Sequence, residues 1–365
     1  MGLYLGLISG TSMDAIDAAL VDFDVAPLRV VAASATPFDP QLKRRVSALI
    51  DHADRVSLDE IGQIDVELGR AFAQAALALM QSAGVSAGGV TAIGSYGQTL
   101  RHRPDLPAPF TWQIGDPNTL AEMTGVSVVA DFRRRDVAAG GQGAPLLPVF
   151  HDQVFRSDAE ERVIANLGGI ANVTILTRDS TVGFDTGPAN RLLDAWAARH
   201  LGKEFDADGA WAATGRVDDT LLRELLDEPY LRLAPPKSTG RELFNLPWLE
   251  NKLGLFSRPP CDVQATLQQF TACTLAAALR QYAPGAALYV CGGGAHNIGL
   301  LNAIAALIAP NRVASTTVLG LDPDYVEAVA FAWFAKRTLE GLTSSAGSVT
   351  GAEGARILGG VYRYA

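Results

Sequence analysis

Residues 185–190 place a carboxylate, a hydroxyl, a glycine and an amide directly after an apolar run that ends at Phe184. A helix-like stretch begins at Arg191. Backbone N–H groups between a strand end and a helix start can point at a ligand, and a helix N-terminus favours an anion. The segment is therefore compatible with an active-site corner. The same residue types are ordinary in turns and helix caps, so a hairpin and a capped helix without chemistry would explain it as well.

Three glycine-containing turns each follow a predicted strand. The first, residues 10–14, joins strands at 3–9 and 15–23, and the second, residues 166–172, joins strands at 163–165 and 173–176. The third, residues 292–297, follows a strand at 287–291 and precedes a helix. Such turns let a phosphate or a flat ligand lie on the backbone, which indicates a nucleotide held mainly by main-chain groups. Asp14 and Asp17 are suited to hold a metal ion or water, although a plain hairpin remains the alternative.

Strands and helices alternate through the rest of the chain. Further strands are predicted at residues 30–38, 90–95, 111–114 and 126–130, and helices at residues 40–52, 57–83, 116–123, 191–202, 217–227 and 263–282. A last helix follows residues 321–327. This alternation predicts an α/β fold, in which polar groups at the carboxyl ends of strands, such as residues 96–99, lie where ligands bind.

Several stretches have a more ordinary interpretation. Of the three arginines at 133–135, at least two are expected to be solvated, because adjacent side chains cannot all face one site. Residues 140–145 are glycine-rich and are expected to form a hinge or lid near a domain boundary. Residues 235–241 are expected to be a surface crossing rather than a site. The Gly-x-Ser-x-Gly match at 84–88 follows a helix, so it is interpreted as a linker.

Composition excludes several classes of function. A net charge of -9 argues against nucleic acid as the main partner. The three cysteines and five histidines form neither a disulfide framework nor a metal motif, which fits a reducing cytoplasm. The N-terminus has no signal-peptide pattern, and no apolar run is long enough to cross a membrane. A Walker P-loop and the protein-kinase signatures are also absent.

Two halves that each open with a phosphate-type hairpin resemble the duplicated α/β domains of the sugar kinase, actin and heat-shock ATPase superfamily. More specific segments resemble the anhydro-N-acetylmuramic acid kinase family, in that family's order and over almost the whole chain. They are SGTSMDAIDAALVD, GSYGQTLRH, TWQIGDPNTLAE, VVADFRRRDVAAGGQGAPLLPVF, ANLGGIANVTIL, GFDTGPANRLLDAW, YVCGGGAHN and GARILGGVY.

The resemblance implies two ribonuclease-H-like α/β domains with an ATP cleft between them. We expect an N-terminal domain at residues 1–130 and a C-terminal domain at 131–365, whose tail packs back on the first. It further implies a cytoplasmic enzyme of cell-wall recycling that usually forms a homodimer. Such an enzyme uses ATP and Mg²⁺ to convert 1,6-anhydro-N-acetylmuramic acid to N-acetylmuramic acid 6-phosphate. Its partner is thus a small amino sugar, without nucleic acid or membrane.

The site residues are carried over by position. The resemblance makes Asp185 the catalytic carboxylate and places Tyr96, Arg133 and Glu327 at the sugar. It assigns ATP contacts to Gly10, Thr11, Ser12, Met13, Asp14, Ala15, Ile16, Asp17, Asn166, Gly168, Gly169, Gly187, Gly292, Gly293, Gly294 and Asn297. Asp14 is also the candidate magnesium ligand.

The sequence departs from the family pattern at three positions. Ala15 and Ala189 replace glycines, and Tyr96 replaces a histidine. The alanines would narrow the phosphate turns if those positions need positive φ, whereas a tyrosine can still donate a hydrogen bond. Two other functions therefore stay open: a related kinase for another sugar, and an actin-like ATP-binding module without catalysis.

Overall fold

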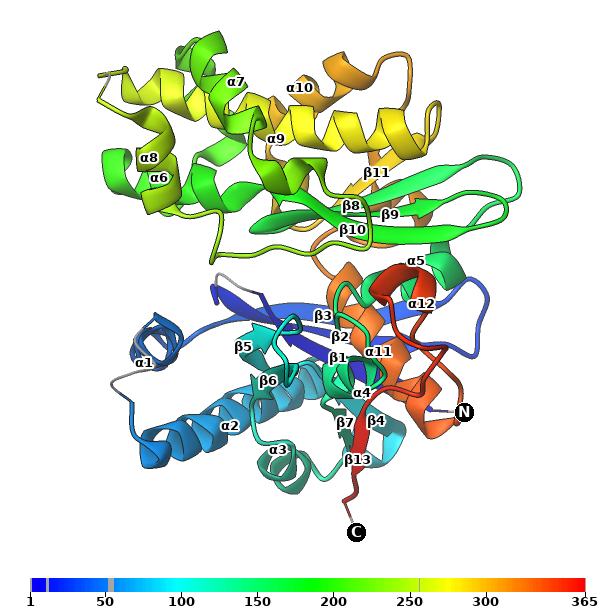
Figure 1. The fold of residues 1–365 in the computed structure, drawn as a ribbon. Helices are drawn as coiled ribbons and strands as arrows, with labels where there is room; N and C mark the ends of the chain where they lie inside the picture. The colour runs from blue at the N-terminus through cyan, green and yellow to red at the C-terminus, as the bar shows by residue number, and fades with distance from the viewer. Residues whose placement is uncertain (1, 11–12, 52–55, 256, 365) are drawn as a thin grey trace. The chain divides into compact units, whose positions relative to one another are not determined.

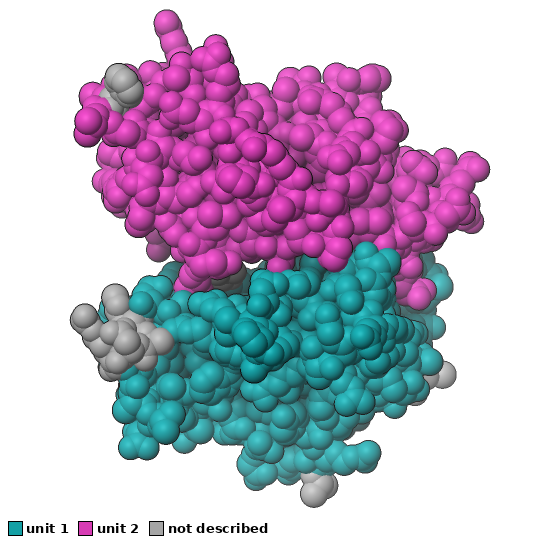
Figure 2. Space-filling model, in the orientation of Figure 1, with its two compact units in different colours: residues 1–150, 325–365 teal, residues 151–324 magenta. Residues whose placement is uncertain are grey.

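The structure, a computed structural model, describes residues 2–10, 13–51, 56–255 and 257–364. The chain divides into two compact units, Met1–Phe150 together with Tyr325–Ala365, and His151–Asp324 (Figure 2). The boundary expected between residues 130 and 131 falls inside the first unit. One reason is that α4 (Phe132–Ala138) packs against β6 (Phe110–Ile114) of that unit. The other is that β13 (Gly360–Tyr362) extends its sheet next to β7 (Val128–Ala130).

The first unit is built on a six-stranded sheet with the order β13-β7-β4-β1-β2-β3 (Figure 1). Strands β1 (Leu3–Ser9), β2 (Ala15–Asp22) and β3 (Arg29–Pro37) form an antiparallel meander. Strands β4 (Val90–Ser95) and β7 continue it in parallel with β1. The three-strand meander followed by two parallel strands is the ribonuclease-H-like arrangement that was predicted.

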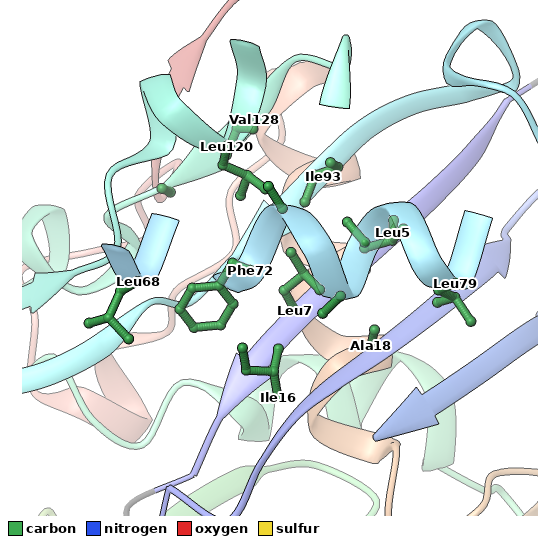
Figure 3. Close-up of a cluster of buried hydrophobic side chains, with 14 of the residues drawn as sticks. Leu5, Leu7, Ile16, Ala18, Leu68, Phe72, Leu79, Ile93, Leu120 and Val128 are labelled. Atoms are coloured by element: carbon green, nitrogen blue, oxygen red, sulfur yellow. The ribbon is translucent and has the colours of Figure 1, made fainter. Parts of the chain in front are cut away.

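Successive residues of β1 point to opposite faces of this sheet, and a different helix packs on each face. Leu5 and Leu7 are fully buried and belong to the cluster that includes Leu68 and Phe72 of α2 (Leu58–Ser82; Figure 3). Gly6 points to the other face, where a Cβ would overlap the carbonyl oxygen of Ala328. That carbonyl belongs to α11 (Val326–Leu339). Gly94, which is paired with Gly6 in β4, meets α11 in the same way.

Replacing Gly6 by alanine is therefore expected to destabilise the protein. The new methyl group meets the rigid backbone of α11, and overpacking of this kind typically costs about 1–3 kcal/mol. Thermal unfolding would show this as a lowered Tm. Gly62 in α2 is the control, since its added Cβ meets nothing within 4 Å. An alanine there should raise the Tm slightly, and an equal Tm for both variants would contradict the close packing of α11.

The second unit repeats the topology with the strand order β10-β9-β8-β11-β12. Strands β8 (Arg162–Leu167), β9 (Ile170–Leu176) and β10 (Thr181–Pro188) are antiparallel. Strands β11 (Ala287–Cys291) and β12 (Val313–Ser315) follow in parallel with β8. The buried face of the sheet packs on α9 (Pro260–Tyr282) and α10 (Ile298–Ile308) (Figure 1).

The buried residues of a second apolar cluster in this unit come from helices and the turns between them. It joins the first half of α9 to α6 (Asn190–Leu201), α7 (Asp219–Leu226) and α8 (Leu246–Leu253). Among the described helices, none is both long and apolar enough to cross a membrane.

Most strands and long helices agree with the predicted ranges, but several short elements were missed. These are β5 (Gln98–Arg103), α4, α5 (Leu147–Phe155), α8, β12, α12 (Gly347–Thr350) and β13. Their sequences are short or highly polar, and tertiary contacts decide their form. β5, for example, pairs only with β6 in a two-stranded sheet. Of the described helices, α1 (Pro40–Asp51) and α3 (Pro117–Thr124) lie close to their predicted positions.

Candidate active site

Asp185 lies at an irregularity in an edge strand. It pairs with Asn172 of β9, and the register of the two strands then shifts before Gly187. A bulge of this kind bends a strand and re-aims its side chains, which is why bulges are common beside active sites. Gly187 has φ +151°, a conformation that side chains rarely adopt. The half-buried Asp185 carboxylate is thus placed at the last regular pair of β10.

The segment 235–241 runs alongside Asp185, contrary to the expected surface crossing. The amide of Thr239 donates to Oδ2 of Asp185 at 2.9 Å, and the amide of Asp185 donates to the carbonyl of Lys237 at 3.2 Å. The hydroxyl of Tyr230 donates to the carbonyl of Asp185 at 2.9 Å. The prediction was wrong because β10 has a free edge, which an extended backbone can cover. Pro235 and Pro236, which fix an extended conformation, were the only local signal.

The position of α6 after Asp185 suggested that its first amides could bind an anion. In the structure these amides are already hydrogen-bonded within the protein. The amides of Ala189 and Arg191 donate to the carbonyl of Gly169, at 3.0 and 3.1 Å. The amide of Asn190 donates to the carbonyl of Gly168 at 3.0 Å. The turn between β8 and β9 therefore uses its carbonyls to cap α6, and these first amides are already satisfied.

The second unit brings Asn166 and the glycines that follow β11 together. Asn166 is the penultimate residue of β8 and lies opposite Cys291, at the shared carboxyl edge of these parallel strands. Gly292 has φ +76°, and a Cβ there would overlap Oδ1 of Asn166. A Cβ on Gly294 would meet the side chain of Leu167 at 2.5 Å. Gly292 therefore needs glycine for both conformation and space, and Gly294 for space.

Asn166 Oδ1 is buried and has no hydrogen-bond partner among the described residues. A buried amide in this state indicates a missing polar partner, and a bound nucleotide offers several. Gly293 continues into a one-turn 3₁₀ helix, Gly293–His296. Asn297 then caps α10, since its Oδ1 accepts from the amide of Leu300 at 2.9 Å. Because Oδ1 of Asn297 is used in the cap, its Nδ2 is the side-chain group that could donate to a ligand.

The N-terminal turn is described except for Thr11 and Ser12, which lie outside the described residues. Met13 has φ 53°, an uncommon conformation for a non-glycine residue. Its amide donates to the carbonyl of Gly10 at 3.1 Å, which closes the turn. Asp14 pairs with Lys43 of α1 at 2.7 Å. Strained backbone of this kind is found at ligand-binding turns.

Two residues of this turn cannot reach a nucleotide with their side chains. Met13 is 3% exposed and Ile16 is 1% exposed, and both belong to the hydrophobic cluster under α2. Ala15 and Asp17 lie in β2 beside them. Met13 and Ile16 therefore belong to the core, the Met13 amide is bonded to Gly10, and Ile16 is paired with Ser9 and Thr36 in the sheet. No group of three metal-ligating side chains occurs among the described residues, so Asp14 remains a lone candidate ligand.

Tyr96 and Arg133 form one polar group in the first unit. The guanidinium of Arg133 donates to the Tyr96 hydroxyl at 3.0 Å and to the carbonyl of Gly143 at 2.7 Å. It also lies over the tyrosine ring, 5.2 Å from the centroid. The ring of Tyr96 packs on Phe331, 5.0 Å between centroids. Glu327 lies one helical turn before Phe331 in α11, so the two side chains share a face.

The neighbouring arginines differ from Arg133, as expected. Arg134 and Arg135 are exposed, and Arg134 lies 3.5 Å from the carboxylate of Asp131. A buried polar network continues behind Arg133, where His102 contacts the Thr111 hydroxyl at 3.1 Å. Burial, and then the charge of Arg133, lowers the pKa of His102 to about 4. This histidine is therefore neutral at physiological pH.

Comparison with known proteins identifies the family to which the sequence patterns pointed. The family model described as anhydro-N-acetylmuramic acid kinase matches residues 2–364. The chain belongs to this family.

Named relatives cover nearly the whole chain. An anhydro-N-acetylmuramic acid kinase of Coxiella burnetii (strain Dugway 5J108-111) is 52% identical over 363 residues, which is 98% of this chain and 97% of the relative. The same enzyme of Xanthomonas campestris pv. campestris (strain 8004) is 52% identical over 365 residues, 99% of this chain and 97% of the relative. A solved structure of a ROK family glucokinase from Streptomyces griseus is more distant. It is 15% identical with a TM-score of 0.42, covering 92% of this chain and 100% of that chain.

The three departures from the family pattern are accommodated locally. Ala189 has φ -111° and Ala15 lies in β2, so neither alanine is in the left-handed region that would require glycine. The two alanines therefore do not strain the backbone of the phosphate turns through a positive φ. Tyr96, in place of histidine, hydrogen bonds through its hydroxyl to Arg133 and contacts the Thr99 hydroxyl at 2.7 Å.

Proposed function

We propose that this protein is an ATP-dependent kinase that opens 1,6-anhydro-N-acetylmuramic acid and phosphorylates it. The observation that carries the proposal is Asp185, a half-buried carboxylate held at a strand bulge by hydrogen bonds to its side chain and main chain. It lies within a chain that matches the kinase family from residue 2 to residue 364. A binding module would have no need to fix a carboxylate in this way.

In the proposed reaction, Asp185 acts as a general base. It removes a proton from a water molecule as the water oxygen attacks the anomeric carbon of the sugar. The bond from that carbon to O6 breaks, which opens the anhydro bridge. O6 then takes the γ-phosphoryl group of ATP, so that N-acetylmuramic acid 6-phosphate and ADP are formed. A carboxylate suits this role because the attacked centre is oxocarbenium-like and the base needs only to receive one proton.

ATP is proposed to bind through the glycine-containing turns of both units. Gly10, Thr11, Ser12, Met13, Asp14, Ala15, Ile16 and Asp17 would contribute chiefly main-chain groups to the phosphates, together with Gly168, Gly169 and Gly187. Asn166, Gly292, Gly293, Gly294 and Asn297 would form the nucleoside side. The unpartnered oxygen of Asn166, and the close approach of the Gly292 backbone to it, fit this assignment.

Mg²⁺ is proposed to bind with ATP rather than in a preformed protein site. Magnesium commonly uses one or two carboxylates together with substrate phosphates, and Asp14 suits that role with a side chain that is 64% exposed. The ion would neutralise the charge on the transferring phosphoryl group. Lys43 holds Asp14 on one side, so the carboxylate already has a defined position.

The sugar is proposed to contact Tyr96, Arg133 and Glu327. The Tyr96–Arg133 pair offers a fixed guanidinium, which is the group best suited to a carboxylate, and the muramic acid class of sugars carries one. A homodimer and a cytoplasmic location follow from the family resemblance and belong to the same proposal.

Turnover with different sugars distinguishes this proposal from its alternatives. ADP release should be fast with 1,6-anhydro-N-acetylmuramic acid and slow with ordinary N-acetylmuramic acid. A kinase for another sugar would show the opposite preference or would use neither compound. A binding module would bind ATP, as measured by calorimetry, and release no ADP with either sugar.

A further inference from the structure

The ammonium group of Lys237 is held in one place beside the Asp185 strand. It donates to the carbonyl of Leu231 at 3.2 Å and to that of Tyr230 at 3.4 Å. It also lies over two aromatic rings, 4.8 Å from the centroid of Tyr230 and 5.8 Å from that of Phe184. Phe184 directly precedes Asp185 in β10. A half-buried lysine fixed by four contacts is unlike an ordinary surface lysine, whose flexible side chain is solvated.

The main chain of the same segment is bonded to Asp185 itself. The carbonyl of Lys237 accepts from the amide of Asp185, and the next amide but one, that of Thr239, donates to the carboxylate. The coil containing these residues lies beside the edge of β10 (Figure 1). The same residue thus holds the Asp185 strand through its main chain and carries a positive charge close to that strand.

Asp185 interacts electrostatically with both Lys237 and Tyr230. Burial lowers the pKa of Lys237, while the negative charge of Asp185 acts in the opposite direction and raises it. Burial raises the pKa of Tyr230, and the charges of Asp185 and Glu242 add to that effect. Electrostatic interactions are mutual, so the ammonium that feels Asp185 also stabilises its ionised form. Tyr230 is neutral at physiological pH, so it does not add a charge that opposes the ionised form of Asp185.

We propose that Lys237 is a positioning residue for the reaction, which holds Asp185 in place and keeps it ionised. This inference rests on the proposed role of Asp185 as the base. The base must be deprotonated before it can take a proton from water. A cation fixed nearby favours this ionised form. The segment 235–241 is thus part of the proposed site, and its only local sequence signal is the pair Pro235 and Pro236.

The acid side of the pH–rate profile tests the proposal. Activity is lost as the pH falls through the pKa of the base, so a variant that raises this pKa moves the acid limb to higher pH. Lys237→Met, which removes the charge and keeps the length, should move the limb of kcat/KM upward by about 0.5–1 pH unit. Lys237→Arg keeps the charge and should leave the limb where it is in the unmodified protein. An unmoved limb in Lys237→Met, or an equal shift in both variants, would overturn the proposal.

Lys252 provides a matched control in the same unit. Its ammonium also lies over an aromatic ring, 5.6 Å from the centroid of Trp248, and 3.7 Å from the carboxylate of Glu228. Lys252→Met therefore removes a comparable cation whose partners are Trp248 and Glu228 instead of residues of β10. It should leave the acid limb unchanged, and a shift as large as that of Lys237→Met would show that the effect is not local.

A titration without substrate separates this inference from the proposed function. Carboxyl-carbon NMR of aspartate-labelled protein can follow Asp185, assigned by the loss of its signal in Asp185→Asn. The pKa of Asp185 should be higher in Lys237→Met than in the unmodified protein, whatever the enzyme's substrate. An identical pKa in both would contradict the role of Lys237. Absence of turnover in the unmodified protein would instead contradict the function alone.

Discussion

Asp185→Asn is expected to lower turnover of the anhydrosugar by about 10²–10⁴-fold, the usual contribution of a general base. The amide has nearly the same shape as the carboxylate, and its oxygen can still accept from the Thr239 amide. It cannot take a proton from the attacking water. The affinity for ATP and the thermal stability should therefore be retained, as calorimetry and a melting curve would show.

An aspartate at a plain surface turn provides the control. Asp179 is exposed in the turn between β9 and β10, and Asp179→Asn removes the same charge from the same unit. Its turnover should match that of the unmodified protein. If Asp185→Asn turned over nearly as fast as this control, the base would have to be another residue.

Gly292→Ala is expected to weaken ATP binding by about tenfold or more. The new Cβ would overlap Oδ1 of Asn166, so the buried amide proposed to contact the nucleotide must move. A hydrogen bond lost at a buried polar group costs roughly 1–3 kcal/mol, and 1.4 kcal/mol corresponds to tenfold in affinity. Titration calorimetry with ATP would measure the change.

Gly285, two residues before β11, provides a control variant that introduces the same backbone strain away from Asn166. Gly285 has φ +91°, and a Cβ there meets nothing within 4 Å. Gly285→Ala should lower the Tm through strain of the same kind and leave ATP affinity intact. Equal losses of ATP affinity in the two variants would mean that the space beside Asn166 is not part of the nucleotide site.

The fold was largely predictable because its strands are bounded by clear turn signals. Strands β1, β4 and β11 were predicted at their observed residues, since each is a short apolar run that ends at a glycine or polar turn. The order of strands in each sheet came instead from the family resemblance. The boundary expected after residue 130 lies after Phe150 instead, because α4 packs against β6 of the first unit. The expected return of the tail to the first unit is made by β13.

The site was predictable only in part, for a physical reason. Asp185 and the glycine turns have local signatures, a polar group or glycine after a strand. Lys237 and Thr239 have none, because they reach Asp185 through main-chain bonds to an edge strand more than fifty residues away. Met13 and Ile16 lie in the N-terminal motif, but their side chains are buried in the core of the first unit. The motif does not reveal which of its side chains face the core.

The mass of the product tests the central claim most directly. The protein should be incubated with ATP and 1,6-anhydro-N-acetylmuramic acid, and the phosphorylated sugar measured by mass spectrometry. Hydrolytic ring opening predicts a product heavier than the starting sugar by one phosphoryl group and one water molecule. A product heavier by the phosphoryl group alone would mean that the anhydro ring stays closed, and it would contradict the role assigned to Asp185.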